Sequence, residues 1–449
     1  MRTSRDTRRA SVVKNVPWDK FKKIAAGKTK TVHQLLDPKG KWPDPESVVI
    51  VNKNDITAGD GARRAAPRGK GALSGATNDN VFGLLAEAGL PVAFEFTHAN
   101  QTEFVAKKCA MYPLEVVVRR KAMGSYLKRN PHVPAGTVFP HLKAEFYLKT
   151  KDKNWKGAVL PKDDPLIRFA DTGAELFHPS EPLALQAPFM TLPVQLAPSL
   201  DLKNMEDIAV RAFLVLEKAW ALLGAELIDF KVEFGLDFKG NLLLADVIDA
   251  DSWRVVKAGD HLDKQPFREG EPASQTLERY RRVKELTDRF QIPQQRVVLF
   301  MASEKDESDS FLTALANHGF RVCGNAGDVV LICASAHKQP QAVLAKAIQA
   351  VCERPDCVII AAAGRSNGLG PMLAANTMAP VITVPLNFKE FPEDVWSSLR
   401  PPSQVPVMTV VDPYNAVLAA MRILAQRNPR LYMQTAMEVN QRQKHVISL

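Results

Sequence analysis

Short runs of apolar residues recur regularly in the last third of the chain, and segments with helical spacing separate them. The strand-like runs are RVVLFM, DVVLICA, CVIIAAA, PVITVPL and VPVMTVV, and the helical segments cover about 307–318, 340–353, 370–378 and 413–426. Strands that are apolar on both faces and alternate with helices are typical of a parallel sheet covered by helices on both sides. We therefore expect residues 295–449 to form a three-layer α/β domain.

The pattern before residue 262 is less regular. Strand-like runs SVVIVN, LEVVVRR, AELIDFKVEF and LLLADVI alternate unevenly with helical stretches such as 204–223, whereas the proline-rich residues 127–204 predict mainly long loops. This mixture favours an α+β domain with an antiparallel sheet over residues 17–262. A linker is expected over 263–294. It contains a helix whose apolar residues lie on one face, namely Leu277, Tyr280, Val283, Leu286 and Phe290.

Composition limits the classes of protein that this chain can represent. Of its 449 residues, 46% are hydrophobic and 24% are charged, which excludes a collagen-like or wholly disordered chain. No apolar run approaches the roughly 20 residues that span a bilayer, and we expect no secretory leader. The five cysteines lack CxxC spacing. Their pattern argues against a disulfide framework or structural zinc site and favours a reducing compartment.

The net charge indicates anionic ligands. Lys and Arg number 59 and Asp and Glu 49, which gives +10 and suits either nucleic acid or small polyanions such as phosphates. The chain has only 6 Trp and 6 Tyr and no recognisable nucleic-acid-binding motif, so small anions are favoured. Residues 1–16 carry four arginines. We expect a basic flexible tail there, with an organelle-targeting leader as the alternative.

The strongest chemical signal is LIDFKVEFGLDFKGNLLLADVIDADSWR at 227–254. Alternate residues of a strand share a face, so Lys231 and Glu233 lie on one charged face. If Lys239-Gly240 is the centre of a two-residue turn, Glu233 lies directly opposite Asp246. Opposed carboxylates repel each other, and a Mg²⁺ ion bound by both would offset that repulsion. The alternative is a surface hairpin whose acids pair with lysines, and a shift of one residue would reverse the faces.

Two basic segments are candidates for binding phosphates or carboxylates. AAGKTKTVHQLL at 25–36 places a glycine and two lysines before a strand-like run, although the P-loop pattern GxxxxGK[ST] is absent. VVVRRKAMGSYLKRN at 116–130 places five cations around a Gly-Ser pair, directly after a predicted strand. Guanidinium groups bind such oxyanions with two hydrogen bonds. A solvated basic loop is the alternative in both places.

Together with KNDITAGDGARR at 53–64 and GKG at 69–71, these segments resemble SAICAR synthetase over about 18–262. That family joins aspartate to carboxyaminoimidazole ribotide (CAIR) in purine biosynthesis. The resemblance implies an ATP-dependent ligase that uses Mg²⁺ and has a nucleotide cleft between two subdomains. Asn54 departs from the pattern, because the family usually has an acid there.

The resemblance also implies roles for individual residues. The nucleotide site would contain Gly27, Lys28, Lys30, Lys53, Lys231, Glu233 and Asp246, with Glu233 and Asp246 as the magnesium ligands. The substrate's phosphate and carboxylate groups would be held by Arg119, Ser125 and Arg254, with Asp251 nearby in the substrate site. In the implied reaction, the CAIR carboxylate attacks the γ-phosphoryl group and the aspartate amine then displaces phosphate. Lys231 would assist this transfer by contacting the nucleotide, and no protein nucleophile is required.

In the C-terminal part, each unusual segment follows a predicted strand. These segments are MASEKD at 301–306, SAHK at 335–338 and AGRSNGLGP at 363–371. Carboxyl ends of parallel strands share one edge of the sheet, where ligands bind. The residues expected to converge there are Ser303, Asp306, Ser335, His337, Lys338, Arg365, Ser366 and Asn367. A histidine at such an edge suits proton transfer, with an ordinary loop histidine as the alternative.

With the NT pair at 376–377 and DVWSSLRPP at 394–402, these segments resemble AIR carboxylase of the CO₂-using class. The resemblance implies a flavodoxin- or Rossmann-like sheet and addition of CO₂ to C4 of aminoimidazole ribotide (AIR), without ATP, biotin or metal. His337 would carry the C4 proton, and Ser335 and the RSNG turn would border the CO₂ site. Ser303, Asp306 and Lys338 would bind the ribose phosphate. Ala302 and a longer segment before Ser335 depart from the family pattern.

The two resemblances support each other, because the product of the carboxylase is the substrate of the ligase and the domain order matches the animal bifunctional enzymes. We expect a cytosolic homo-octamer formed through the carboxylase domain, in which Leu431, Met433, Met437 and Val439 pack across a subunit boundary. Its substrates would be AIR, CO₂, CAIR and L-aspartate, with no nucleic-acid or membrane partner. The alternatives are a degenerate carboxylase domain that mainly oligomerises, a nucleic-acid-binding protein with degenerate enzyme domains, and a general phosphotransferase.

Overall fold

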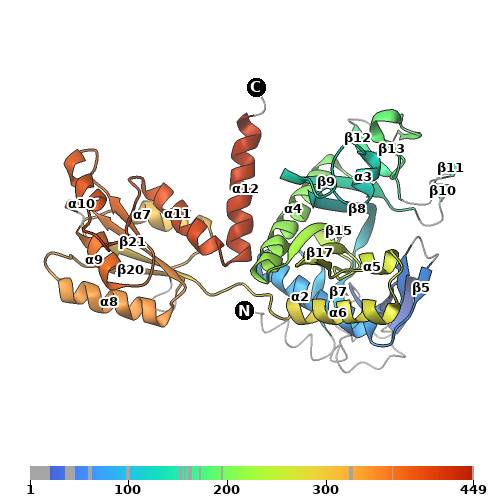
Figure 1. The fold of residues 1–449 in the computed structure, drawn as a ribbon, viewed down its shortest axis with the longest axis horizontal. Helices are drawn as coiled ribbons and strands as arrows, with labels where there is room; N and C mark the ends of the chain where they lie inside the picture. Colours follow the sequence, from blue (N-terminus) through green and yellow to red (C-terminus); the bar gives the residue numbers. More distant parts are fainter. Residues whose placement is uncertain are drawn as a thin grey trace. The chain divides into compact units, whose positions relative to one another are not determined.

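The chain divides into two compact units, residues 1–291 and 292–449, in a computed structural model (Figure 1). The structure describes residues 21–35, 46–58, 63–97, 102–150, 154–155, 158–159, 164–170, 173–193, 196–322, 327–366 and 368–446. The predictions for the basic tail at 1–16 and for Asn367 lie outside these residues. Within them, no helix is both long and apolar enough to cross a membrane, and the four described cysteines are free.

The first unit is an α+β unit, as predicted, with two large antiparallel sheets. Its strands are β1 Phe21–Ala26, β2 Lys30–Leu35, β3 Ser47–Asn52, β4 Ile56–Ala58, β5 Arg63–Ala65, β6 Phe94–Thr97, β7 Glu103–Lys107, β8 Ala110–Lys121, β9 Val138–Leu148, β10 Asn154–Trp155, β11 Ala158–Val159, β12 Leu166–Ala170, β13 Gly173–Phe177, β14 Met190–Leu192, β15 Glu226–Leu236, β16 Leu242–Ala245, β17 Trp253–Lys257 and β18 Asp260–His261. Its helices are α2 Lys70–Glu87, α3 Ser125–Arg129, η3 Leu183–Leu185, α4 Ser199–Leu222, α5 Gln265–Arg268 and α6 Ala273–Thr287.

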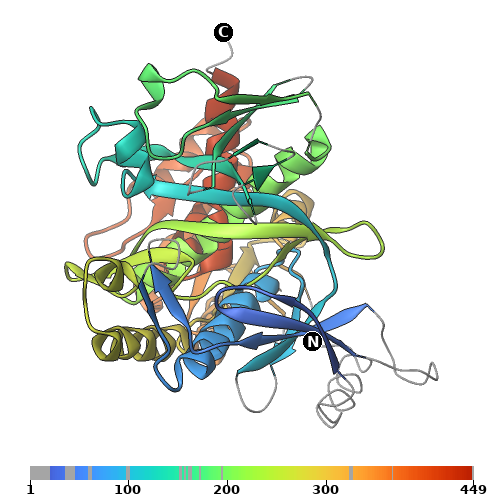
Figure 2. The ribbon, with the colours of Figure 1, turned by 90° about the vertical axis from the view of Figure 1, so that its right-hand side faces the viewer.

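One sheet has the strand order β1-β2-β3-β7-β6. The larger sheet has the order β14-β13-β12-β9-β8-β15-β17-β18, with β16 paired to β15. Its long central strands run side by side across the unit (Figure 2). Strand β15 buries Phe230, Val232 and Phe234 on one face, as the alternation predicted. Its other face carries the charged residues, so this strand positions them beside the neighbouring strands.

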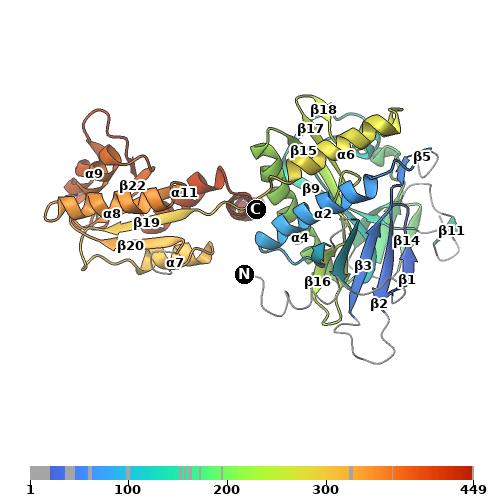
Figure 3. The same ribbon diagram turned by 90° about the horizontal axis from the view of Figure 1, so that it is seen from below.

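Two parts of the first unit differ from the sequence-based expectation. The segment 127–204 was expected to be mainly loop, but it contains the 11-residue strand β9, which pairs with β8 in the middle of the sheet. The helix expected in the linker is α6, and it lies along α2 (Figure 3). Tyr280 and Val283 of α6 are buried, 1% and 0% exposed. Helix α6 therefore packs as part of the first unit.

The second unit is the predicted parallel sheet between two layers of helices. Its elements are β19 Arg296–Met301, α7 Asp309–Asn317, β20 Val329–Cys333, α8 Pro340–Glu353, β21 Cys357–Ala363, α9 Leu369–Asn376, β22 Val381–Pro385, η5 Pro392–Val395, α10 Trp396–Leu399, β23 Met408–Thr409, α11 Pro413–Ala425 and α12 Pro429–Val446. The strand order is β20-β19-β21-β22-β23, and every pair is parallel.

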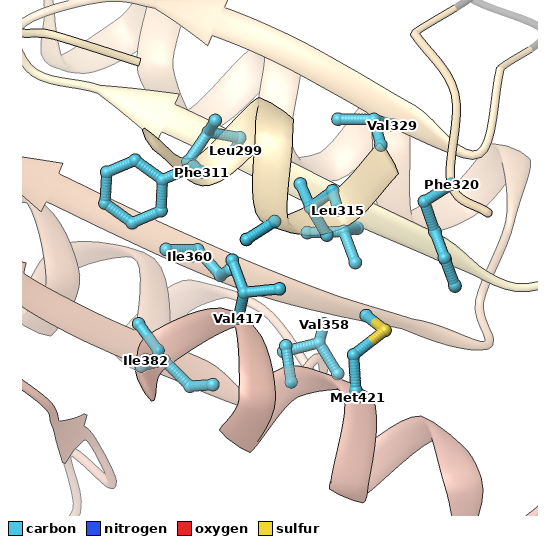
Figure 4. Close-up of a cluster of buried hydrophobic side chains, with 14 of the residues drawn as sticks. Leu299, Phe311, Leu315, Phe320, Val329, Val358, Ile360, Ile382, Val417 and Met421 are labelled. Atoms are coloured by element: carbon cyan, nitrogen blue, oxygen red, sulfur yellow. The ribbon is translucent and has the colours of Figure 1, made fainter. Parts of the chain in front are cut away.

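Alternate residues of β19 face two separate cores. Val297 and Leu299 belong to the cluster with α7 and α11 (Figure 4), whereas Val298 and Phe300 face α8 and α9. This arrangement explains why the strand is apolar at every position. Leu431 and Met433 are 1% and 4% exposed, and Leu431 belongs to the α7–α11 core. The prediction that Leu431 packs across a subunit boundary is therefore wrong, whereas for Met433, Met437 and Val439 it stays a prediction.

Candidate active sites

The β15–β16 hairpin differs by one residue from the predicted register. Glu233 pairs with Ala245, so the predicted pairing of Glu233 with Asp246 is wrong. The turn is a three-residue loop closed between Asp237 and Asn241, and Gly240 adopts a φ of 78°. Asp237 Oδ1 accepts hydrogen bonds from the backbone of Lys239 and Asn241, at 2.9 and 2.8 Å. Because glycine can adopt a left-handed conformation at the end of the loop, three residues connect the strands where two were predicted. The extra residue shifts the register of the hairpin by one.

Asp246 follows the end of β16 and itself has a φ of 68°. It forms an ion pair with Lys30 of β2. Glu233 is 6% exposed and accepts a hydrogen bond from Lys149 Nζ at 2.5 Å. Both carboxylates thus lie beside Lys30, although neither is opposite the other in the hairpin. Burial raises the pKa of Glu233, but Lys231, Lys149 and Lys30 outweigh burial and hold that pKa below its usual value.

Lys30 is the least exposed of the three lysines in this group, with 17% of its side chain exposed against 39% for Lys149 and 40% for Lys231. Burial lowers the pKa of Lys30 to about 8, and Glu233 opposes this shift. Lys231 Nζ lies 2.5 Å from Glu115 Oε1 and 3.8 Å from Glu233 Oε1. The site therefore combines a cluster of ammonium groups with carboxylates, an arrangement that can bind phosphate oxygens and a cation together.

The turn between β1 and β2 carries the other residues of the predicted nucleotide site. The backbone N–H of Gly27 donates to Lys30 O at 2.9 Å, and Lys53 Nζ donates to Gly27 O at 2.7 Å. Lys53 N also donates to Thr29 O at 2.7 Å. Gly27 and Lys28 are exposed. Lys53 thus fixes the turn that leads into Lys30.

A second group of charges lies at the other end of β15. Asp229 Oδ2 lies 2.7 Å from Arg119 Nη1 and 2.5 Å from Arg254 Nη1. Arg119 Nε also lies 2.8 Å from Glu145 Oε2, and its Nη2 is 3.4 Å from Ser125 Oγ. Three residues that the sequence assigned to the substrate, Arg119, Ser125 and Arg254, are therefore brought together. Arg119 is only 3% exposed, so much of its hydrogen-bonding capacity is used within the protein.

Gly124 fits this group closely. It has a φ of 60°, and a Cβ added there would lie 2.3 Å from Arg254 Nη2. Glycine is therefore required for two reasons, the left-handed backbone and the approach of the Arg254 guanidinium. Arg268 is exposed and lies near enough to Arg254 for the two positive charges to act on each other. Two guanidinium groups held close together favour an anion between them.

Asp251 lies in a buried cluster next to this group. Its carboxylate is 2.8 Å from Lys70 Nζ, 3.2 Å from Lys264 Nζ and 2.5 Å from the Tyr280 hydroxyl. These protein groups occupy both of its oxygens. From the sequence, Lys70 was only part of the GKG motif and Tyr280 only part of an apolar helix face. Neither was expected to contact Asp251, and Lys149, Lys264 and Arg268 were not predicted as site residues, because these contacts join separate elements of the fold.

In the second unit, β19, β20 and β21 are adjacent, so the segments that follow them share one edge of the sheet. Asp306 accepts hydrogen bonds from the backbone N–H groups of Ser303 and Gly364, and burial raises the pKa of Asp306. The buried Oδ2 of Asp306 has no hydrogen-bond partner among the described residues. A buried carboxylate oxygen in this state is suited to accept a hydroxyl of a ligand.

The remaining residues of this edge surround the glycine-rich turn. A Cβ added at Gly368 would lie 3.3 Å from His337 Nε2, so the His337 ring lies against this turn. Ser335 Oγ accepts the backbone N–H of Lys338 at 3.4 Å. Arg365 stacks on Phe391, with 3.8 Å between the guanidinium carbon and the ring centroid. Ser366 has a φ of 41°. His337, Lys338, Arg365 and Ser366 are exposed and accessible to a ligand.

Comparison with known proteins assigns each unit to a family. Residues 23–171 and 184–284 match the model for SAICAR synthetase, and residues 281–445 match the model for AIR carboxylase. The human bifunctional phosphoribosylaminoimidazole carboxylase/phosphoribosylaminoimidazole succinocarboxamide synthetase is 35% identical over 419 residues, 91% of each chain. The chain belongs to this family of bifunctional enzymes of purine biosynthesis.

A second bifunctional relative and a solved structure of a succinocarboxamide synthase are also similar to this chain. The Drosophila melanogaster protein of the same name is 34% identical over 421 residues, 91% of this chain and 89% of the relative. A crystal structure of phosphoribosylaminoimidazole-succinocarboxamide synthase from Ehrlichia chaffeensis is 25% identical, with a TM-score of 0.47, and covers 60% of this chain and 100% of that chain. The family predicted from the sequence motifs is confirmed for both halves.

Proposed function

We propose that the second unit adds CO₂ to AIR to form CAIR, and that the first unit joins L-aspartate to CAIR with hydrolysis of ATP to ADP and phosphate. The observation that carries the ligase assignment is the meeting of Lys30, Glu233 and Asp246 at one place. A second, arginine-rich group lies at the other end of β15. One strand therefore connects a site suited to a nucleotide with a site suited to an anionic substrate.

Magnesium fits the donor groups at the first of these places. Mg²⁺ prefers oxygen ligands and is commonly held by one or two carboxylates together with phosphate oxygens. Glu233 and Asp246 supply two carboxylates, and both already lie beside an ammonium group. These two residues would hold the ion, which when bound supplies neutralisation of charge on the transferred phosphoryl group.

The protein's own contribution to the ligase reaction is positioning and charge. Lys30 and Lys231, with Gly27, Lys28 and Lys53 at the adjacent turn, bind the ATP phosphates. Arg119, Ser125 and Arg254 orient CAIR so that its carboxylate oxygen attacks the γ-phosphorus and ADP leaves. The aspartate amine then attacks the acyl carbon, expels phosphate and loses a proton to solvent. The lysines stabilise the negative charge that spreads over the phosphoryl oxygens.

For the carboxylase, AIR binds at the edge formed by the ends of β19, β20 and β21. The unpartnered oxygen of Asp306 accepts a ribose hydroxyl, while Ser303 and Lys338 bind the phosphate. C4 of AIR attacks the carbon of CO₂, and His337 accepts the C4 proton as the carboxylate forms. Ser335, Arg365 and Ser366 border the CO₂ site. No ATP, biotin or metal enters this step.

The finer biological setting belongs to the same proposal. We propose a cytosolic homo-octamer formed through the second unit. In support, that unit exposes large apolar side chains, among them Met378, Trp396, Leu399, Met408 and Tyr414, which are 96%, 48%, 51%, 40% and 49% exposed. Exposed apolar side chains in this number favour association. Light scattering coupled to size-exclusion chromatography would distinguish an octamer from a monomer.

A coupled assay with single omissions tests the proposed function. The full chain is supplied with AIR, bicarbonate, ATP, magnesium and L-aspartate, and both CAIR and the aspartate adduct are measured. Omission of ATP, magnesium or aspartate should leave CAIR formation intact and abolish the adduct. Omission of bicarbonate should abolish both products, and added CAIR should restore the adduct. ATP hydrolysis that does not depend on aspartate and CAIR would contradict the proposal.

A further inference from the structure

Asp251 is held by side chains from three separate segments of the first unit. Lys70 at the start of α2 approaches one carboxylate oxygen at 2.8 Å, and Lys264, just before α5, lies 3.2 Å from the other. The Tyr280 hydroxyl, from α6, donates to that second oxygen at 2.5 Å. Lys70 and Tyr280 are each 1% exposed. The Asp251 carboxylate is therefore bound by three side chains of the protein itself. Few of its hydrogen-bonding positions remain for a substrate.

The loop that carries Asp251 connects the two halves of the proposed ligase site. It starts at Asp246, beside Lys30, and ends at Ser252, directly before β17. Arg254 is the second residue of β17, where it pairs with Asp229 of β15 and lies 2.5 Å from the Asp229 carboxylate. Asp249 organises the loop internally, because its Oδ1 accepts the backbone N–H of Asp251 at 2.9 Å and its carbonyl accepts that of Ser252 at 2.8 Å. Asp251 lies only three residues before Arg254, so it anchors the loop close to the point where the chain enters β17.

The other end of the loop is fixed independently. The strand β16 pairs with β15 up to Ala245, and the backbone N–H of Ile248 donates to the buried Asn78 Oδ1 at 2.9 Å. These contacts separate Asp246 from a disturbance at Asp251. Pairing with β15 also holds the backbone of Arg254, but Asp251 lies three residues from Arg254 and five from Asp246. A loss of the Asp251 anchor is thus expected to reach the Arg254 side chain more strongly than the carboxylate beside Lys30.

Tyr280 is the part of this anchor that comes from α6. Its ring also lies under Lys70, with 5.2 Å between Nζ and the ring centroid. A phenylalanine would keep the ring and its contact with Lys70 while removing the hydrogen bond to Asp251. The hydroxyl can thus be tested separately from the packing of α6 on α2.

We propose that Tyr280 is a positioning residue of the ligase site, which through Asp251 holds Arg254 in the orientation that binds CAIR. This inference rests on the proposed function, because it assumes that Arg254 binds CAIR. Tyr280 touches neither the nucleotide site nor the arginine directly. Its effect is expected on the affinity for CAIR and not on that for ATP.

The experiment compares Tyr280→Phe with Tyr112→Phe in the full chain. Tyr112 is a matched control, because its hydroxyl donates to Asp201 Oδ2 at 2.5 Å, between β8 and α4. Loss of one charge-assisted hydrogen bond in a positioning contact is expected to raise KM for CAIR about tenfold in Tyr280→Phe. The KM for ATP should stay within about twofold, and the carboxylase rate of the same chain should be unchanged. Tyr112→Phe should change none of the three.

An unchanged KM for CAIR in folded Tyr280→Phe would overturn the inference, as would an equal rise in KM for CAIR and ATP, which indicates general loosening. If Tyr280→Phe does not fold, Asp251→Asn takes its place, because it keeps the side-chain shape and removes the charge that Lys70 and Lys264 bind. A KM for CAIR that is unchanged in that variant also overturns the inference. If the unmodified chain forms no aspartate adduct from CAIR, the proposed function itself fails.

Discussion

Lys30 of the five-stranded sheet forms an ion pair with Asp246, which follows a strand of the larger sheet. Two elements that are more than 200 residues apart in the chain therefore meet at one partly buried ammonium group. The negative charge of Glu233 also stabilises this ammonium group. The Lys30–Asp246 ion pair therefore marks the place where we propose that ATP and magnesium bind.

The charge of Lys30 makes ATP binding dependent on pH. Burial lowers the pKa of Lys30 to about 8, so the ammonium group is mostly protonated at pH 7 and mostly neutral at pH 9. We expect KM for ATP to rise about tenfold between these pH values, since the charge lost is the one that faces the phosphates. Lys30→Arg keeps its charge throughout this range and should show a flat profile. The same rise in Lys30→Arg would assign the pH dependence to another group.

Arg119 is expected to contribute strongly to stability. Replacing it with methionine leaves the carboxylates of Asp229 and Glu145 short of a buried partner, and breaking a buried ion pair from one side costs about 3 to 5 kcal/mol. Arg211→Met is the control, because its ion pair with Asp207 is 40% and 42% exposed and is worth about 0.5 kcal/mol. Urea unfolding of the two variants measures the difference. Equal losses of free energy would contradict the network.

Gly124 is expected to control the position of Arg254. In Gly124→Ala the new methyl group would collide with the guanidinium at 2.3 Å, so KM for CAIR should rise about tenfold or more. Gly136→Ala is a matched control, with a φ of 79° and no atom within 4 Å of an added Cβ. It introduces similar backbone strain without the collision. If both variants raise KM for CAIR equally, backbone strain and not Arg254 is responsible.

Asp306 is expected to bind AIR through its unpartnered oxygen. Asp306→Asn replaces a charged acceptor with a neutral one, and we expect KM for AIR to rise about tenfold while ligase activity with added CAIR is unchanged. Burial raises the pKa of Asp306, so the carboxylate takes up a proton at a higher pH than a free aspartate does. AIR binding should therefore weaken on acidification in the unmodified chain and not in Asp306→Asn. Steady-state kinetics as a function of pH measures both effects.

The sequence predicted those parts of the fold that depend on local alternation. The parallel sheet of the second unit and the buried faces of β15 follow from residues adjacent in the chain. Strand β9 was missed because the proline-rich composition around it suggested loop, although its pairing with β8 overrides local preference. The hairpin register was missed by one residue because Gly240 permits a three-residue loop.

Some residues of the candidate sites could likewise be predicted from the sequence, and others could not. Lys30, Glu233 and Arg254 belong to motifs and could be selected from the sequence. Lys149 and Tyr280 could not, because they act on Glu233 and Asp251 across 84 and 29 residues of chain. Only the pairing of strands and the packing of α6 on α2 bring them into contact. Sequence spacing carries information within one element and not between elements that meet in the folded chain.

We propose that one chain carries two separate active sites, one around Glu233 and one around His337. The most direct test measures both products from AIR in the full chain for Glu233→Ala and His337→Ala. Glu233→Ala should abolish the aspartate adduct and leave CAIR formation at its normal rate. His337→Ala should abolish CAIR formation and still convert added CAIR. Loss of both activities in either variant, with the protein folded, would contradict two independent sites.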